Sequence, residues 1–322
     1  MDSEEEECCG SGCNNCVLDS KIKKNQSELP ENYTNIFNGN YVNFSVESIK
    51  KVATSVYLIN FRWQSEGLTE NLILKIPPGW YLQLRIKAGS IRKDKNVIFK
   101  DFNTFEDPEE FLAKLEGQAK HDKDTSKEYL SRPYTPINTD ARNLSFDILF
   151  KLENFGKMSQ LIAKLKIGDE IEFKGPYGEL VYHRNTFRNL YLFSHGVAVA
   201  PLYSLISSIV SDESDETFIH LIACYQNINE ILLRDEVQNL RQFWNFNASI
   251  YLAHETTDIE GQVKFRENIY RKRLQHDNID KIIQFRDKTS YFLICGTEKF
   301  TGEICTTLTH LGIDQDNIFV FR

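Results

Sequence analysis

Polar and apolar residues alternate in several short segments of the first half of the chain, at residues 42–46, 57–61 and 144–152. Because successive side chains of a strand point to opposite faces, a period of two predicts half-buried strands. Polar turns such as 77–79 separate these strands, and this arrangement is typical of a small antiparallel barrel. The clearest of these strands is predicted at 144–152. Its polar face carries Asp147 and Lys151, and its apolar face comprises Leu144, Phe146, Ile148, Phe150 and Leu152.

The second half has a different pattern, in which short continuous apolar runs alternate with helical periodicity. The runs are 190–193, 218–224, 250–253 and 291–295, and residues 319–321 predict a final aromatic strand. Strands buried on both faces and separated by helices predict a parallel sheet with helices on both sides. Such a sheet binds nucleotides at the carboxyl ends of its strands.

Length and composition agree with an antiparallel barrel followed by an α/β domain. The chain has 322 residues, 41% of them apolar and 26% charged, which predicts two domains and a tail. We place the tail at 1–40, the barrel at 41–183 and the α/β domain at 188–322. The net charge of −8 argues against nucleic acid as a partner. No apolar run approaches the roughly 20 residues of a membrane span, and the acidic N-terminus lacks a secretory signal. We therefore expect a soluble, intracellular protein, cytoplasmic or mitochondrial.

The stretch Arg132-Pro133-Tyr134-Thr135 has the chemistry needed to hold a phosphate-bearing ring cofactor. The planar guanidinium of Arg132 fits a pyrophosphate. Proline residues fix the backbone on either side of Tyr134, so that its ring is presented in one orientation. The hydroxyl of Thr135 is short enough to contact a ring nitrogen.

A second motif, Gly156-Lys157-Met158-Ser159, follows the predicted strand at 144–152. Gly156 permits a close approach of the backbone. The residues after it begin a helix, whose free N–H groups and dipole favour an anion. Each motif alone also fits an ordinary turn or helix cap, but the two occur in order, separated by one strand.

In these two motifs the sequence resembles the NADH-cytochrome b5 reductase family of ferredoxin-reductase-type flavoproteins, which carries Arg-x-Tyr-Thr followed by Gly-Lys-Met-Ser. The resemblance covers about residues 41–322. It implies a Greek-key barrel that binds FAD and a doubly wound α/β domain that binds NADH. It also implies electron transfer from NADH through the flavin to a one-electron acceptor protein, such as cytochrome b5. The alternative is a degenerate reductase fold that binds flavin or a partner with little turnover.

The resemblance also assigns roles to individual residues. It implies catalytic positions at Thr135 and Cys295. It implies cofactor-binding positions in both domains, at Arg132, Pro133, Tyr134, Thr135, Phe150, Lys151, Gly156, Lys157, Met158, Ser159, Gly196, Ala200, Pro201 and Gly296.

Several residues depart from the family pattern. Where the family has Gly-Gly-Thr-Gly, this chain has His195-Gly196-Val197-Ala198, and Thr297-Glu298 replace prolines. Glu153 replaces an aromatic residue close to the flavin phosphates. These substitutions favour the degenerate alternative, whereas the intact barrel motifs favour the enzyme.

Two further segments bear on specificity. Residues 230–237 resemble the family's Ile-Leu-Leu-Arg helix start, and no Arg or Lys between Cys224 and Arg234 is present to hold a 2′-phosphate, which favours NADH over NADPH. Residues 264–273 predict a basic helix that either docks an acidic acceptor or is simply solvated. Its cations are Lys264, Arg266, Arg271, Lys272 and Arg273.

The N-terminal tail and an inserted segment complete the chain. Cys13-x-x-Cys16 has metal-ligand spacing, with Cys8 and Cys9 nearby, and the tail resembles the short "oxidoreductase-like" N-terminal module. A metal or redox role and a flexible tail with reactive thiols both remain open. The charged residues 100–128 indicate an inserted surface loop, partly disordered and with room for a short helix, which is either solvated or covers the flavin or engages a partner.

Overall fold

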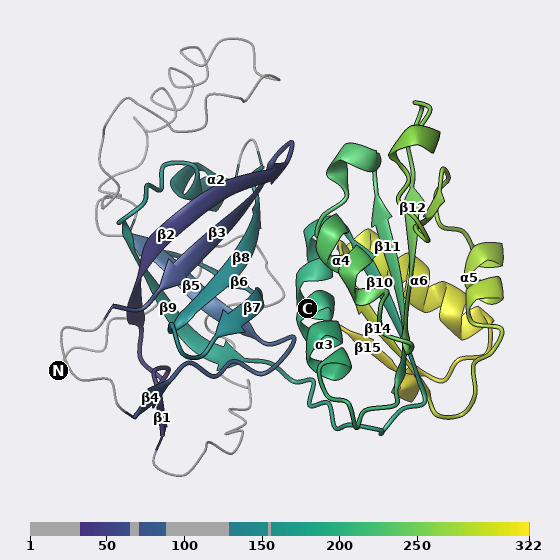
Figure 1. Cartoon of the computed structure of the whole chain (residues 1–322), viewed down its shortest axis with the longest axis horizontal. Helices are drawn as coiled ribbons and strands as arrows, with labels where there is room; N and C mark the ends of the chain where they lie inside the picture. The colour runs from purple at the N-terminus through teal and green to yellow at the C-terminus, as the bar shows by residue number, and fades with distance from the viewer. Residues whose placement is uncertain (1–32, 65–70, 88–128, 154–155, 322) are drawn as a thin grey trace.

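The computed structural model describes residues 33–64, 71–87, 129–153 and 156–321. In Figure 1 a β-barrel and an α/β domain lie side by side, and the C-terminus lies next to the helix labelled α3. The tail cysteines Cys8, Cys9, Cys13 and Cys16 and the insertion at 100–128 lie outside the described residues. No helix among those ranges is long and apolar enough to cross a bilayer.

The first domain is an antiparallel seven-stranded sheet in the order β6-β5-β9-β2-β3-β8-β7. The chain passes from one edge strand of this order, β6, to the other, β7, through Thr135 alone, so the two edges meet at that residue. A separate pair, β1 and β4, lies beside the barrel. The bounds are β1 Thr34–Asn35, β2 Val42–Ala53, β3 Val56–Arg62, β4 Leu72–Ile73, β5 Tyr81–Lys87, β6 Tyr129–Tyr134, β7 Pro136–Asp140, β8 Ser145–Lys151 and β9 Glu170–Tyr177.

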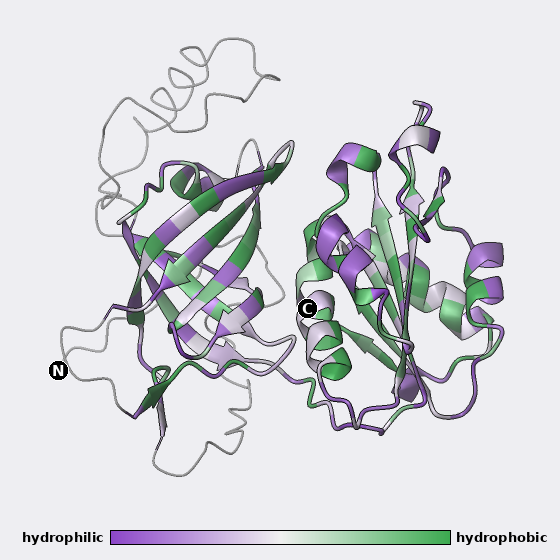
Figure 2. Cartoon of the chain, viewed as in Figure 1, coloured by the Kyte–Doolittle hydropathy of each residue, from purple (hydrophilic) through white to green (hydrophobic). Residues whose placement is uncertain are grey.

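Aromatic side chains fill the barrel. Phe146 of β8 packs edge-on against Phe44 and Phe173, with ring centroids 4.9 and 5.0 Å apart. The alternation predicted for this strand is confirmed, since Phe146, Ile148 and Phe150 are buried, and Figure 2 shows the same alternation on the barrel strands. Leu149, on the opposite face, is buried as well, because it packs against the second domain.

The second domain is a six-stranded parallel sheet in the order β13-β12-β11-β10-β14-β15. Its strand order reverses between β10 and β14, which is the switch point where such sheets bind nucleotides. The strands are β10 Asn189–His195, β11 Phe218–Tyr225, β12 Phe246–Leu252, β13 Asn268–Tyr270, β14 Ser290–Cys295 and β15 Ile318–Val320. The four apolar runs and the final strand are therefore confirmed.

Helices cover both faces of this sheet. The helices α3 (Val199–Val210) and α4 (Arg234–Leu240) pack on the face toward the barrel, and α5 (His276–Ile282) and α6 (Glu298–His310) pack on the other. The helix predicted to start at Arg234 is confirmed. Short 3₁₀ turns are η3 Gly196–Ala198, η4 Ile228–Glu230, η5 Glu260–Gln262 and η6 Gln315–Asn317.

The basic helix predicted over residues 264–273 is wrong, because this segment forms a turn followed by strand β13. The carboxylate of Glu267 accepts hydrogen bonds from the backbone N–H of Lys264 at 2.9 Å and from the guanidinium of Arg234 at 2.6 and 2.7 Å. These bonds fix a non-helical turn. Ile269 then pairs with Ile250 of β12 in the sheet.

The two domains share an apolar interface. Ile137 and Leu149 of the barrel belong to the same buried cluster as Val199 of α3. The turn containing Gly79, which has φ of +77°, donates its N–H to Ser204 Oγ of α3 at 3.4 Å. The shared cluster holds the carboxyl end of the parallel sheet against the barrel.

Candidate functional site

The Arg132-Pro133-Tyr134 segment forms the end of β6, paired with β5. The ring of Tyr134 packs against that of Phe150 on β8, with centroids 4.6 Å apart and planes inclined by 56°. Burial raises the pKa of Tyr134, so its phenol is neutral. The half-buried guanidinium of Arg132 donates from Nη1 to the carbonyl of Ser131 at 2.8 Å.

The Gly156-Lys157-Met158-Ser159 segment begins the short helix α2, Lys157–Ile162, which contacts β6. The Oγ of Ser159 accepts a hydrogen bond from the backbone N–H of Glu153 at 3.0 Å. A Cβ added at Gly156 would lie 3.0 Å from this same Oγ, which is tighter than most real Cβ contacts. Glycine therefore keeps this turn compact beside the end of β6.

The exposed Lys151 at the end of β8 lies near η3, the turn that follows β10. Burial, followed by the charges of Lys151 and Arg273, lowers the pKa of His195, so its imidazole is neutral at neutral pH. Gly196 has φ of +61°, and a Cβ added there would meet nothing within 4 Å. Glycine is therefore favoured at this position by its backbone conformation, with open space beside it.

The switch point places Ser194 in register with Cys295 of β14. Cys295 packs against the cluster that contains α3, on the barrel side. The Oγ of Ser194 is buried and has no hydrogen-bond partner among the described residues. A buried hydroxyl without a partner is costly, so this atom is poised to bond a ligand group.

On the other side of the switch point, the ring of His195 stacks on Phe300 of α6, with centroids 5.5 Å apart and planes inclined by 30°. Gly296 lies between them: an added Cβ would be 2.6 Å from Cδ1 of Phe300 and 3.3 Å from Cβ of His195. The two rings thus join the end of β10 to α6.

The thiol of Cys295 has low nucleophilic reactivity in the folded protein. Burial raises the pKa of its thiol from 9.0 to about 12, which lowers the thiolate fraction by about a thousandfold. At about pH 8, iodoacetamide should therefore label Cys295 about a thousandfold more slowly in the native protein than in denaturant. Peptide mass spectrometry of timed samples measures both rates, and equal rates would contradict the burial of this thiol.

The remaining positions from the family pattern divide into two groups. Phe150, Met158, Ala200 and Pro201 are buried. Thr135 and Gly296 are partly exposed, and Lys157 is exposed. The sequence motifs did not predict a role for the Ser194 hydroxyl, which has no hydrogen-bond partner among the described residues, or the stacking of His195 on Phe300. An apolar strand that ends in Ser-His is a signal that could have pointed to Ser194.

The residues present fit a flavin dinucleotide together with a nicotinamide dinucleotide. Arg132, Lys151 and Lys157 supply cations of the kind that pyrophosphates require. Tyr134 supplies a flat ring held by its neighbour, and Ser194 supplies an unsatisfied polar atom. The donors of the barrel would hold FAD, and the switch point would hold NAD.

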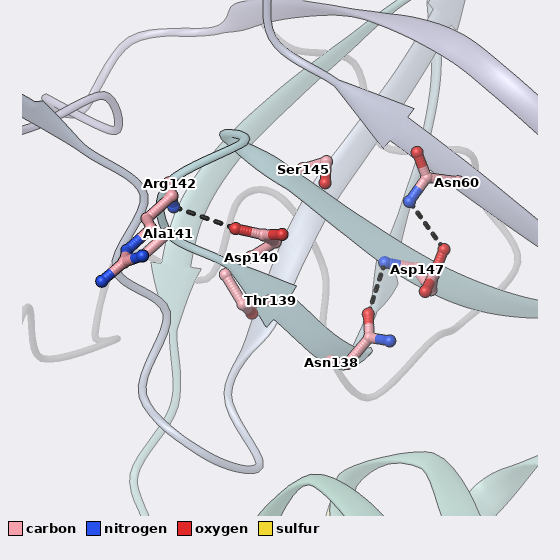
Figure 3. Close-up of a pocket in the computed structure, with 8 residues that line it drawn as sticks. All are labelled: Asn60, Asn138, Thr139, Asp140, Ala141, Arg142, Ser145 and Asp147. Atoms are coloured by element: carbon pink, nitrogen blue, oxygen red, sulfur yellow. Dashed lines mark hydrogen bonds between the residues drawn. The ribbon is translucent and has the colours of Figure 1, made fainter.

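A hollow elsewhere on the barrel, shown in Figure 3, does not have this chemistry. It lies at the β7–β8 hairpin, at the far end of β8 from Lys151 and about 20 Å from it. Its polar groups bond one another: Asn60 Nδ2 donates to Asp147 Oδ1 at 2.8 Å, and the N–H of Asp147 donates to Asn138 Oδ1 at 3.2 Å. These bonds account for the polarity of the hollow without a ligand.

Comparisons with known proteins agree with the fold. A family described as "Oxidoreductase FAD-binding domain" matches residues 95–182, and one described as "Oxidoreductase NAD-binding domain" matches residues 192–306. Among solved structures, the cytochrome b5 reductase domain of Ulva prolifera nitrate reductase superimposes with a TM-score of 0.67. It is 19% identical, and the match covers 89% of this chain and all of that one. The barrel followed by a parallel sheet therefore defines an FAD- and NAD-binding oxidoreductase of the ferredoxin-reductase fold.

Sequence relatives narrow this class. The human "NADH-cytochrome b5 reductase-like" protein is 25% identical over 98% of this chain and 92% of its own length. The Candida albicans "NADH-cytochrome b5 reductase 1" is 29% identical over 59% of this chain and 65% of its own length. Over nearly its whole length, the chain is therefore similar to NADH-cytochrome b5 reductase-like proteins.

Proposed function

We propose that the protein oxidises NADH and passes the electrons singly, through bound FAD, to an acceptor protein, with cytochrome b5 as the candidate that the relatives' names suggest. The observation that carries this proposal is the meeting of β6, which bears Arg132 and Tyr134, with the start of α2. Two motifs separated in the sequence thereby supply a cation, an aromatic ring and backbone donors at one place.

In the barrel, Arg132 and the backbone N–H groups at 157–159 would bind the pyrophosphate. Tyr134 would lie against the flavin ring in an orientation fixed by Phe150. Thr135 would donate or accept one hydrogen bond at the edge of that ring. When bound, FAD supplies the conversion of a two-electron hydride into two single electrons.

In the α/β domain, Gly196 would leave room for the second dinucleotide, and Ser194 would hydrogen-bond its nicotinamide or ribose. Cys295 would line the site as a neutral, apolar thiol, since its pKa is about 12. NADH is favoured over NADPH because Arg234, the first cation after Cys224, already pairs with Glu267 at both of its oxygens.

This proposal is tested with the purified full chain. We expect yellow protein that bleaches when NADH is added without oxygen and that recovers its colour when cytochrome b5 is added. Absorbance in the visible range follows both steps, and NADPH is the matched comparison for the donor. Protein that is folded, colourless and unable to take up added FAD would contradict the proposal.

The stacked rings of His195 and Phe300 at the switch point favour a second candidate, a flavin-binding module with little turnover. Yellow protein that does not bleach with NADH would support this candidate.

We also propose domain limits of 41–183 and 188–322. Tyr182 supports a junction there, because its hydroxyl donates to Asp215 Oδ2 of the second domain at 2.7 Å.

A further inference from the structure

The segment Val263–Lys272, the basic-aromatic loop, exposes apolar side chains among cations. Phe265 is 82% exposed, the highest value among the large apolar side chains that the structure describes, and Tyr270 is 41% exposed. The loop lies at β13, an edge strand, so no further described strand covers it. We infer that this loop docks the protein on an anionic lipid surface.

The loop is held rigidly, so the exposure of Phe265 does not come from a loose chain. Its carbonyl accepts a hydrogen bond from Gln238 Nε2 of α4 at 2.6 Å. Next to it, Glu267 is buried and anchors the turn through Arg234 and the N–H of Lys264. A loop that is ordered before binding loses little conformational entropy when it meets a surface.

The cations of the loop are available to anions. The guanidinium of Arg266 lies 5.4 Å from the centroid of the Phe265 ring, and Nζ of Lys272 lies 5.9 Å from that of Tyr270. Among the described residues, no ion pair within 4 Å uses Arg266, Arg271 or Lys272.

Two neighbouring cations are already paired, and the turn before the loop carries the exposed carboxylates of Asp258 and Glu260. Lys264 pairs with Asp235, and Arg273 pairs with Glu303 at 2.5 Å. The single carboxylate of the loop, Glu267, is buried against Arg234. The loop is therefore locally basic on a chain whose net charge is −8.

The combination of a protruding phenylalanine and unpaired cations favours a lipid surface over an acidic protein. Anionic headgroups attract the cations, while the boundary with the acyl chains accepts the aromatic rings. An acidic protein surface would satisfy the cations alone unless it also offered a pocket shaped for Phe265. The bilayer interface supplies both environments without such a pocket.

The test is flotation of the full chain with vesicles of phosphatidylcholine alone and with vesicles in which about a third of the lipid is phosphatidylserine. We expect binding to the second kind, and we expect it to weaken when salt is raised to about 0.5 M. Phe265→Ser, and the double change Arg266→Glu with Lys272→Glu, should each reduce the partition coefficient by about tenfold. These side chains are exposed, so the fold should tolerate the changes, and circular dichroism checks this.

Matched controls separate the loop from the rest of the chain. Phe285→Ser removes a phenylalanine that is 78% exposed but lies outside the loop, and Arg142→Glu reverses an exposed charge on the barrel. Neither should alter vesicle binding. The inference is overturned if the wild-type chain ignores anionic vesicles, if the loop variants bind as well as it does, or if only an acidic protein competes for the loop.

Discussion

Arg132→Leu protein is expected to lose its FAD during purification. The guanidinium would make charge-assisted hydrogen bonds to a pyrophosphate, and losing them should raise the dissociation constant of FAD by about a hundredfold. The half-buried Arg132 lies on edge strand β6, so the barrel core should survive the change. The ratio of flavin absorbance to protein absorbance, followed by fluorescence titration with FAD, measures the loss.

Arg142→Leu is the matched control. Arg142 is an exposed arginine of the same domain, at the β7–β8 hairpin, beside the hollow in Figure 3. This variant should retain FAD at the wild-type ratio. Equal loss of FAD from both proteins, or retention by both, would show that the guanidinium of Arg132 does not hold the cofactor.

Glu267→Gln is expected to lower the free energy of unfolding by about 3 kcal/mol at neutral pH, because it leaves the guanidinium of Arg234 without its partner. The Glu267 side chain is only 2% exposed and that of Arg234 20%, so water replaces little of the lost interaction. Thermal unfolding of the holoprotein measures the change. Glu260→Gln, an exposed carboxylate in the preceding turn, is the control and should leave stability unchanged.

The effect of Glu267 should also depend on pH. Burial alone would raise the pKa of this carboxyl, but hydrogen bonds from Arg234 and from the N–H of Lys264 outweigh burial, and the pKa lies below its ordinary value of 4.5. The stabilisation is therefore complete above 4.5 and disappears as pH falls through the lowered pKa. The stability difference between wild type and Glu267→Gln should shrink below pH 4.5; a constant difference would contradict this account.

Features with a local cause were predictable from sequence. The strand Ser145–Lys151 carries its own alternation, and the runs of the parallel sheet are apolar because each strand is buried on both faces. The two barrel motifs were equally readable, because each is a short contiguous segment.

Features that depend on distant partners were not predictable in this way. Leu149 is buried because a second domain covers a face that the pattern marks as polar. Residues 264–273 have the charges of a solvated helix, but Glu267 is held by Arg234, 33 residues away, and this contact selects the turn. The stack of His195 on Phe300 likewise joins the end of β10 to helix α6, about a hundred residues further along the chain.

The passage of the chain through Thr135 has a consequence for the free protein. Strands β6 and β7 are the two edge strands of the sheet and are not hydrogen-bonded to each other. The barrel is therefore closed there by the chain at Thr135 and not by a ladder of hydrogen bonds. Under the proposed function, FAD bound by Arg132 and Tyr134 would lie at one of these edges, and its binding free energy would add to the cost of separating them. Backbone amides of β6 and β7 should therefore exchange with deuterium faster in the apoprotein than in the FAD-bound protein, while those of the parallel sheet keep their protection.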